Sequence, residues 1–382
     1  MEWKLKDLTV DGKGSYGIGA PAVPYQEDKL TYLRITDIND DGSLNFSDLK
    51  SVDAEDAEKY ILKENDIVFA RTGNSTGRSY FYEKQHGTFV YAGFLIKFSL
   101  DPNKVNPRIL KYYTHSKPYF DWVNSFDTGA TRGNINAKTY GDMEIELPSR
   151  KVQDKIVSIL SSLDRKIELN NKINADLEEM AQAIFKNWFV DFEPFKDGKF
   201  VDSELGMIPE GWKVGCLGDI AEITSGKRPP KKSKDKTKEL FIPLIGASDI
   251  MGFTSDVLYE RPILVIGRVG THGVVQRFQE KCWPSDNTLV IESSYYNYVY
   301  QLLKGIDYSA INRGSTQPLI TQTDVKNTDV IIAPENVLKE YESITSTLFS
   351  KHRANIKENS RLSLLRDTLL PRLMSGEIEV PE

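Results

Sequence analysis

The sequence contains one short motif associated with nucleophilic catalysis, Gly73-Asn-Ser75-Thr-Gly77. It follows an apolar run, as the serine turn of an α/β-hydrolase does, so it predicts either a reactive serine or a polar turn. The corresponding loop in the second half of the chain, Gly270-Thr-His272-Gly273, is one residue shorter and has no serine. No Asp–His pairing is recognisable in either half. A polar turn is therefore the better interpretation, and a hydrolase or nuclease is kept as an alternative.

Other motifs for catalysis and for cofactors are missing. There is no Gly-x-x-x-x-Gly-Lys-Ser/Thr phosphate loop, no Asn/Asp-Pro-Pro-Tyr/Phe methyltransferase motif and no Phe-x-Gly-x-Gly loop for S-adenosylmethionine. Gly14, Gly17 and Gly19 follow no clear strand and open no helix. Cys216 and Cys282 are far apart and the four histidines are scattered, which disfavours a disulfide framework or a metal site. We expect no catalytic residue, cofactor or metal in this chain.

Positive charge is concentrated in one short segment. Residues 227–238 contain seven lysines and arginines and a single acid, Asp235. Such a run is either a solvated loop or a contact for nucleic-acid phosphates. Because the chain as a whole has a formal net charge of -6, the run favours a local phosphate contact over a protein that is basic throughout.

Arginine, asparagine and glutamine also gather near apolar runs in both halves. Arg can pair with guanine, and Asn or Gln with adenine, through two hydrogen bonds in the major groove, although any of them can instead stabilise a turn or an ion pair. The candidate DNA contacts are Arg71, Asn74, Arg78, Arg132, Asn134 and Asn136 in the first half, and Lys227, Arg228, Lys231, Lys232, Arg268, Arg277, Arg313 and Gln317 in the second.

The two halves of the chain are a duplication. Trp3 matches Trp212 at a spacing of 209 residues, Arg71 matches Arg268 at 197, and Gly129 matches Gly314 at 185. The decreasing spacing indicates deletions in the front part of the second copy. Each copy is thus a variable globular region followed by a segment in constant register.

The segment in constant register has a helical heptad pattern, with polar interruptions at Lys166 and Asn170 that recur at Lys351 and Asn355. Matching interruptions favour two helices packed on each other over two ordinary core helices, and a buried Asn fixes register. A link of about 20 residues favours an antiparallel pair with a pseudo-twofold axis. The predicted core is Ile156, Ile159, Leu163, Asn170, Ile173, Leu177, Met180, Ile184, Ile344, Leu348, Asn355, Leu362, Leu365 and Leu369.

The globular regions are predicted to be mixed α and β. Short runs of β-formers bounded by Gly, Asn, Asp and Pro indicate strands, and residues 108–124 indicate a helix disturbed by Pro118. The predicted fold is therefore α+β, with two globular domains separated by a long antiparallel two-helix coiled coil. The boundaries are 1–148 and 212–334 for the globular domains, 149–190 and 335–376 for the helices, 191–211 for the linker and 377–382 for the tail.

The length of 382 residues, with 40% hydrophobic and 27% charged residues, is typical of a folded protein of two or three domains. No apolar run approaches the roughly 18 residues of a membrane helix, and the charged start lacks a signal peptide's apolar stretch. We expect a cytoplasmic protein without a membrane partner.

Four segments carry a family resemblance: Ala183–Phe189 (AIFKNWF), Leu205–Trp212 (LGMIPEGW), Gly314–Thr321 (GSTQPLIT) and Leu370–Ile378 (LPRLMSGEI). Together with the duplicated organisation, they resemble the specificity subunit of type I restriction-modification systems over essentially the whole chain. The resemblance implies a non-catalytic subunit. Each globular domain would be a target-recognition domain that binds one half of a bipartite, asymmetric site in double-stranded DNA.

The resemblance also implies partners and their cofactors. The paired helices would set the spacing of the half-sites and dock methyltransferase subunits, expected to be two, which carry S-adenosylmethionine and methylate adenine at N6. A separate motor-nuclease subunit with ATP and Mg²⁺ would cut unmodified DNA. The second recognition domain is shorter, about 120 residues, so the two domains should read different half-sites. The alternative of another class is a coiled-coil scaffold or adaptor without DNA readout.

Overall fold

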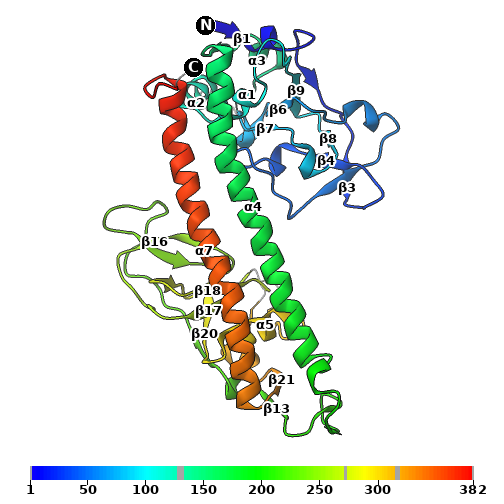
Figure 1. Ribbon diagram of the computed structural model, residues 1–382, viewed down its shortest axis with the longest axis vertical. Coiled ribbons are helices and arrows are strands. Elements are labelled where there is room, and N and C mark those ends of the chain that lie inside the picture. Colours follow the sequence, from blue (N-terminus) through cyan, green and yellow to red (C-terminus); the bar gives the residue numbers. More distant parts are fainter. Residues whose placement is uncertain (1, 127–132, 271–272, 315–318, 381–382) are drawn as a thin grey trace. The chain divides into compact units, whose positions relative to one another are not determined.

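The computed structural model describes residues 2–126, 133–270, 273–314 and 319–380 (Figure 1). By its internal contacts the chain divides into two compact units. Unit 1 comprises Met1–Leu169 with Glu358–Glu382, and unit 2 comprises Asn170–Lys357. Both divisions fall inside long helices, so each unit contains one globular region together with a segment of both helices. None of the described helices combines the length and the apolar composition that a membrane-spanning segment needs.

The globular region of unit 1 contains two four-stranded sheets and a two-stranded ribbon. The first sheet is antiparallel and has the order β2-β9-β6-β7, and the second has the order β3-β5-β4-β8 with β4 and β8 parallel. The elements are β1 (Glu2–Lys4), β2 (Ser15–Tyr16), β3 (Ala22–Pro24), β4 (Thr31–Leu33), β5 (Lys50–Val52), β6 (Asp66–Ala70), β7 (Ser79–Phe81), β8 (Phe89–Tyr91), β9 (Leu95–Ser99), α1 (Arg108–Tyr113), α2 (Lys117–Asn124), α3 (Ala137–Gly141) and β10 (Glu144–Glu146).

The globular region of unit 2 repeats this plan with fewer strands. Its antiparallel sheet has the order β14-β20-β17-β18, its second sheet the order β16-β15-β19, and its ribbon pairs β13 with β21. The elements are β13 (Lys213–Cys216), β14 (Glu222–Ser225), β15 (Ile242–Ile245), β16 (Ile250–Thr254), β17 (Ile263–Gly267), β18 (Val275–Phe278), β19 (Trp283–Pro284), β20 (Thr288–Glu292), α5 (Tyr296–Gly305), α6 (Gln322–Lys326) and β21 (Asp329–Ile332).

The central strands β6 and β17 lie at the predicted apolar runs. Both are buried along their whole length, as an apolar run predicts. Pro118 does divide the predicted helix over 108–124. The first part ends at Tyr113, and Pro118 lies in the first turn of α2, where its missing N–H costs no helical hydrogen bond.

The ribbons correct the predicted alignment of the two front parts. Trp3 pairs with Ile145, whereas the equivalent partner, Val330, pairs with Gly215 rather than with Trp212. The true spacing at the start of the copies is therefore 212 residues (3 to 215) and not 209. Trp212 is buried in the core of unit 2 one residue before β13, so the shared Trp-Lys dipeptide was a coincidence of sequence.

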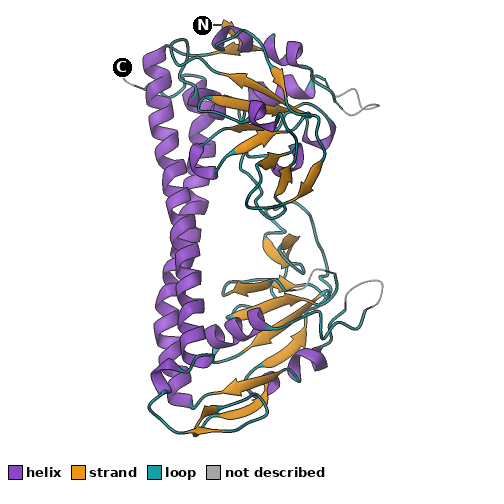
Figure 2. Cartoon of the chain, turned by 90° about the vertical axis from the view of Figure 1, so that its right-hand side faces the viewer, coloured by secondary structure: helices purple, strands orange, loops and turns teal. Residues whose placement is uncertain are grey.

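Two helices of 40 residues each follow the globular regions, α4 (Arg150–Phe189) and α7 (Glu335–Met374). In unit 1 the Asp164 carboxylate lies 3.1 Å from the Arg366 guanidinium. In unit 2 the Phe189 and Tyr341 rings are 5.0 Å apart. Each unit also packs its globular region on its own helical segments (Figure 2). One apolar cluster joins Leu160 of α4 to that region in unit 1, and another joins Phe349 of α7 to the globular region of unit 2.

Along one edge of the predicted core stripe of each helix, the named residues are buried or half-buried. Along the other edge, several of the named residues are exposed and the next residue in the chain is buried instead. Asn170 and Asn355 are buried as predicted. However, Ile159 is 38% exposed while Leu160 is fully buried, and Ile344 is 39% exposed while Thr345 is fully buried. Met180 and Leu365 are exposed in the same way. The physical reason is that each helix also packs on a globular region, which turns the centre of its buried face away from the pattern expected for a helix pair alone.

The segment predicted as the linker, residues 191–211, is packed against unit 2. It forms a short hairpin of β11 (Phe200–Val201) and β12 (Ile208–Pro209), and Phe192 and Ile208 are buried in the unit's core. Phe192 has a left-handed backbone with a φ of 53°, which turns the chain sharply after α4.

Candidate nucleic-acid interface

Arg71 follows β6 and is fixed by its backbone on both sides. Its N–H donates to the carbonyl of Phe94 at 3.0 Å, and its carbonyl accepts from the N–H of Ile135 at 2.9 Å. The guanidinium lies over the ring of Tyr16, 5.0 Å from the centroid. Its Nε is buried and has no hydrogen-bond partner among the described residues. Two hydrogen bonds thus fix the backbone on either side of Arg71, while its Nε donor has no partner in the described part of the chain.

Arg268 occupies the equivalent position in unit 2, after β17. Its N–H donates to the carbonyl of Asn287 at 2.8 Å, and its carbonyl accepts from the N–H of Ile320 at 2.9 Å. Its Nε is also buried without a partner in the described part of the chain. Because Ile320 is 185 residues after its counterpart, the match of Arg71 with Arg268 that the sequence predicted is confirmed by their backbone partners. Two domains therefore present one guanidinium each from the same framework.

The basic run of unit 2 is held against its domain. The N–H of Lys227 donates to the carbonyl of Pro284 at 3.0 Å, and its own carbonyl accepts from Nε1 of Trp283 at 2.7 Å. Further along, Ser233 exchanges two backbone hydrogen bonds with Phe253, at 2.8 and 2.9 Å. The four candidates Lys227, Arg228, Lys231 and Lys232 are exposed. Their charges are consequently available to solvent or to a polyanion on an ordered backbone.

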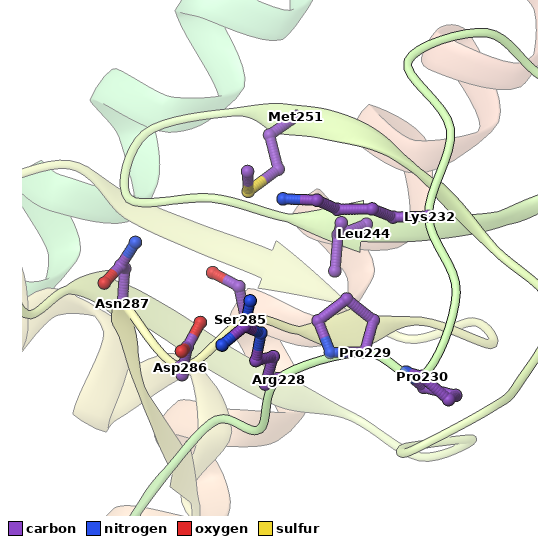
Figure 3. Close-up of a pocket in the computed structure, with 9 residues that line it drawn as sticks. All are labelled: Arg228, Pro229, Pro230, Lys232, Leu244, Met251, Ser285, Asp286 and Asn287. Atoms are coloured by element: carbon purple, nitrogen blue, oxygen red, sulfur yellow. The ribbon is translucent and has the colours of Figure 1, made fainter.

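A cavity of about 350 Å³ lies beneath this basic run (Figure 3). It is lined by Arg228, Pro229, Pro230, Lys232, Leu244, Met251, Ser285, Asp286 and Asn287. The last three residues form the loop between β19 and β20, which also receives the backbone hydrogen bond of Arg268. Sequence reasoning missed this loop, because Asp286 and Asn287 are distant from the basic run and only the strand pairing brings them together.

The family of the chain follows from comparison with known proteins. The family model described as the type I restriction modification DNA specificity domain matches the chain twice, over residues 15–179 and 209–361. The chain belongs to this family.

Relatives agree with this assignment. The chain is 33% identical to the MjaIX specificity subunit of Methanocaldococcus jannaschii over 301 residues, which cover 72% of this chain and 69% of the relative. It is 24% identical to the HindI specificity subunit of Haemophilus influenzae, with 84% and 88% covered. The S subunit from M. genitalium has the same fold, with a TM-score of 0.60 at 16% identity and coverage of 98% and 96%. The predicted role is confirmed: a non-catalytic DNA-specificity subunit, with the chemistry in partner subunits.

Two of the side chains predicted to contact DNA, those of Arg78 and Asn136, form hydrogen bonds within the specificity subunit. Nε of Arg78 donates to Asp40 at 2.7 Å and its Nη1 donates to the carbonyl of Ile38 at 3.0 Å. Asn136 is the N-cap of α3, and its Oδ1 accepts from the N–H of Thr139 at 2.9 Å. These side chains have protein partners that account for their presence without a ligand.

Arg277 is partly buried in unit 2. Its guanidinium is 3.5 Å from the ring centroid of Phe349 and 4.5 Å from that of Tyr300, and Nη2 donates to Oδ1 of Asn297 at 2.6 Å. Burial lowers the pKa of Arg277 below its ordinary value. These contacts favour a packing role over the predicted DNA contact, although Nη1 is buried without a partner among the described residues. The residue instead fastens β18 to α5 and α7.

The remaining candidates lie at exposed turns or outside the described residues. Arg313 forms an ion pair with Asp324 through two of its nitrogens. Asn74 and Asn134 are exposed, Asn74 in the turn after Arg71 and Asn134 opposite Thr72 in an isolated bridge. Arg132 and Gln317 lie outside the described residues.

Ser75 is buried in a 3₁₀ turn whose flanking glycines, Gly73 and Gly77, have positive φ angles of 75° and 88°. A side chain at Gly77 would collide with Val123. Among the described histidines, Nδ1 of His115 bonds the carbonyl of Lys111 instead of any serine. The turn is therefore the close-packed structure that the polar-turn interpretation predicted, and it holds the chain just after Arg71.

Proposed function

We propose that each globular domain of this specificity subunit binds one half of a bipartite site in double-stranded DNA, with Arg71 and Arg268 as equivalent anchors. The observation that carries the proposal is the pair of guanidinium groups on one backbone framework, each with a buried Nε that has no partner among the described residues. A contact that two domains share cannot distinguish two different half-sites. We therefore assign these arginines to phosphate oxygens, which occur at every base pair.

The exposed cations Lys227, Arg228, Lys231 and Lys232, and the exposed amides of Asn74 and Asn134, extend the interface in each domain. The four cations compensate the acidic balance of the chain at the point where DNA phosphates would approach, and the neutral amides offer hydrogen bonds. Arg132 and Gln317 belong to the same proposal on the sequence pattern alone.

We propose further that α4 and α7 form an antiparallel two-helix coiled coil. In support, Asp164 and Arg366 are paired in unit 1, and Nδ2 of Asn355 donates to Oδ1 of Asn174 at 2.9 Å in unit 2. Residue numbers rise along one helix as they fall along the other. The helices occupy 149–190 and 335–376 of the proposed organisation, between recognition domains at 1–148 and 212–334, with a connecting segment at 191–211 and a tail at 377–382. Internal pseudo-twofold symmetry follows from the duplication.

The partners complete the activity. The coiled coil docks two methyltransferase subunits, which bind S-adenosylmethionine and methylate adenine at N6, and a restriction subunit with ATP and Mg²⁺ cuts unmodified DNA. This chain needs no cofactor of its own in that division of labour. The complex acts where the DNA lies, in the cytoplasm.

The test is a map of N6-methyladenine by single-molecule sequencing, in cells that express the methyltransferase subunit with or without this chain. A split motif that depends on this chain is the expected result. Arg71→Ala and Arg268→Ala should each lower DNA affinity without changing the motif, and each should reduce the slope of log affinity against log salt by about one. No new methylation by a methyltransferase shown to be bound to this chain would contradict the proposal and favour the scaffold alternative.

A further inference from the structure

The same hydrogen bonds position one loop in each recognition domain. In unit 1 the N–H of Ile18 donates to the carbonyl of Tyr91 at 3.1 Å, and in unit 2 the N–H of Lys227 donates to the carbonyl of Pro284 at 3.0 Å. The N–H of Arg71 then binds the carbonyl of Phe94, three residues after Tyr91. In the same way the N–H of Arg268 binds the carbonyl of Asn287, three residues after Pro284. The three residues after Tyr91 and the three after Pro284 therefore occupy equivalent places beside the arginine.

The side chains on this shared framework are apolar in unit 1 and polar in unit 2. In unit 1 the three residues are Ala-Gly-Phe, ending at Phe94, and in unit 2 they are Ser-Asp-Asn, ending at Asn287. The residue that follows the donor of the first hydrogen bond is Gly19 in unit 1, after Ile18, and Arg228 in unit 2, after Lys227. One backbone geometry consequently presents an apolar surface in one domain and a polar one in the other.

A second pair of positions differs in the same sense. The hydroxyl of Tyr16 accepts a hydrogen bond from the N–H of Ala137 at 3.1 Å. In unit 2, Nε2 of Gln322 donates to Oγ of Ser225 at 2.8 Å, and Gln322 follows Ala137 by the same 185 residues. The two equivalent positions stay hydrogen-bonded, through the backbone N–H of Ala137 in unit 1 and the side-chain amide of Gln322 in unit 2. The aromatic ring that covers Arg71 is replaced by the small polar side chain of Ser225.

In unit 2 the side chains of Arg228, Ser285, Asp286 and Asn287 line the cavity of about 350 Å³. Asp286 and Asn287 are exposed at one side of it, and Lys232 and Met251 lie at the other (Figure 3). Ser285 is 3% exposed, and its Oγ has no hydrogen-bond partner among the described residues. The cavity thus offers hydrogen-bond acceptors and donors together with a positive charge.

In unit 1 the equivalent loop positions, Ala92, Gly93 and Phe94, have no polar side chain. Phe94 is 59% exposed and Tyr16 is 42% exposed, a large apolar area for two neighbouring positions beside Arg71. Exposed aromatic side chains of this kind contact thymine methyl groups or base faces, because neither requires a hydrogen bond.

We propose that Arg228, Asp286 and Asn287 at this cavity read base edges of the second half-site by hydrogen bonding, and that Phe94 with Tyr16 reads the first half-site by apolar contact. The proposal rests on the proposed function and deepens it. The shared arginine supplies affinity in each domain, and the side chains that differ between equivalent positions supply the difference in sequence. Asp accepts from cytosine N4, Asn pairs with adenine and Arg pairs with guanine, so the second half-site contains at least one of these bases at the contacted positions.

Duplex DNA fits this surface better than a small anion. Lys232 and the neighbouring Lys227 and Lys231 are exposed beside the cavity, so a ligand with several phosphates near a row of hydrogen-bonding edges would use both features at once. A single phosphate would leave Asp286 facing a like charge.

The experiment uses the full chain in complex with its methyltransferase subunits and a library of DNA duplexes randomised in both half-sites. Asn287→Ala and Asp286→Ala should relax the preference at one or two positions of the second half-site by about tenfold to a hundredfold, with the first half-site unchanged. Lys234→Ala is the matched control on the same exposed segment, outside the cavity lining. It should weaken binding to all sequences equally.

The reciprocal variant replaces Phe94 by Asn and should change the first half-site alone. Thermal midpoints equal to that of the wild type show that the exposed loops still fold. A wild-type motif in the Asn287 and Asp286 variants, or a change in the other half-site, would overturn this proposal and leave the proposed function intact. A wild-type complex without any bipartite motif would overturn the proposed function and this proposal together.

Discussion

Nδ2 of Asn355 donates a hydrogen bond to Oδ1 of Asn174 at 2.9 Å, between α7 and α4 of unit 2, and both side chains are buried. A buried polar pair between helices contributes little net stability, because two amides must be taken from water. It does penalise every other register of the helices, since a shifted register would leave each amide buried without its partner.

The pair predicts that a double variant is more stable than the single variant. Asn355→Leu leaves the amide of Asn174 without this partner and should lower the free energy of unfolding by about 1–3 kcal/mol. The double variant Asn174→Leu, Asn355→Leu should recover most of that loss, because both polar groups are removed. Urea denaturation checks this, with the exposed Lys351→Ala as the control. Equal losses in the single and double variants would show that the pair does not couple the helices.

The position of Arg277 predicts a structural and not a DNA-binding phenotype. Arg277→Ala removes the packing on Phe349 and leaves Asn297 without its donor, so it should lower the free energy of unfolding by about 2–4 kcal/mol. The recognised DNA motif should stay the same. Thermal denaturation and motif mapping measure the two effects separately. Arg261→Ala, at an exposed pair with Glu292, should lose about 1 kcal/mol or less.

Glu342 predicts a measurable pH dependence. Burial raises its pKa to about 6, although its carboxylate accepts hydrogen bonds from the N–H groups of Asn297 and Tyr298 at the start of α5. Because the folded state holds the proton more tightly than the unfolded state, stability falls as the pH rises from about 4.5 to about 6, by roughly 2 kcal/mol for this group. Above pH 6 the loss is complete.

The test compares Glu342→Gln with the wild type between pH 4 and pH 7. The amide keeps an acceptor for α5 and cannot ionise, so its stability relative to the wild type should increase by roughly 2 kcal/mol over this range. Glu340→Gln, at an exposed position on the same helix, is the control. A constant difference between Glu342→Gln and the wild type would rule out ionisation of Glu342 as the source.

The features that occur in both halves of the chain could be predicted from the sequence. The register at Arg71 and Arg268 is recognisable, because both arginines follow apolar strands and precede a glycine-rich turn. The front register was mistaken, since a chance Trp-Lys dipeptide is a stronger sequence signal than the Leu5 and Leu217 positions that are equivalent in the structure. Both leucines are fully buried, and their N–H groups bind the carbonyls of Met143 and Thr328.

The sites that depend on long-range pairing could not be predicted. Arg277 is an exposed-looking residue in the sequence, and only the packing of α5 and α7 shows that aromatic rings surround it. The loop at Asn287 contains no motif. It becomes part of a site because β17 and β20 are neighbours, which places it next to Arg268.

The length of the helices predicts the spacing of the two half-sites. A helix of 40 residues spans about 60 Å at 1.5 Å per residue, enough to separate two readers by the roughly 34 Å of one DNA turn. If the proposed coiled coil sets the distance between the half-sites, inserting four residues into α4 adds about 6 Å and should lengthen the unspecified spacer of the methylated motif. The half-sites should not change, because Arg71, Phe94, Arg268 and Asn287 keep their surroundings. Exchange of residues 1–148 for another recognition domain is the complementary control and should change one half-site at constant spacing. Methylome sequencing measures both. An unchanged spacer in the insertion variant would show that the helices do not set the distance.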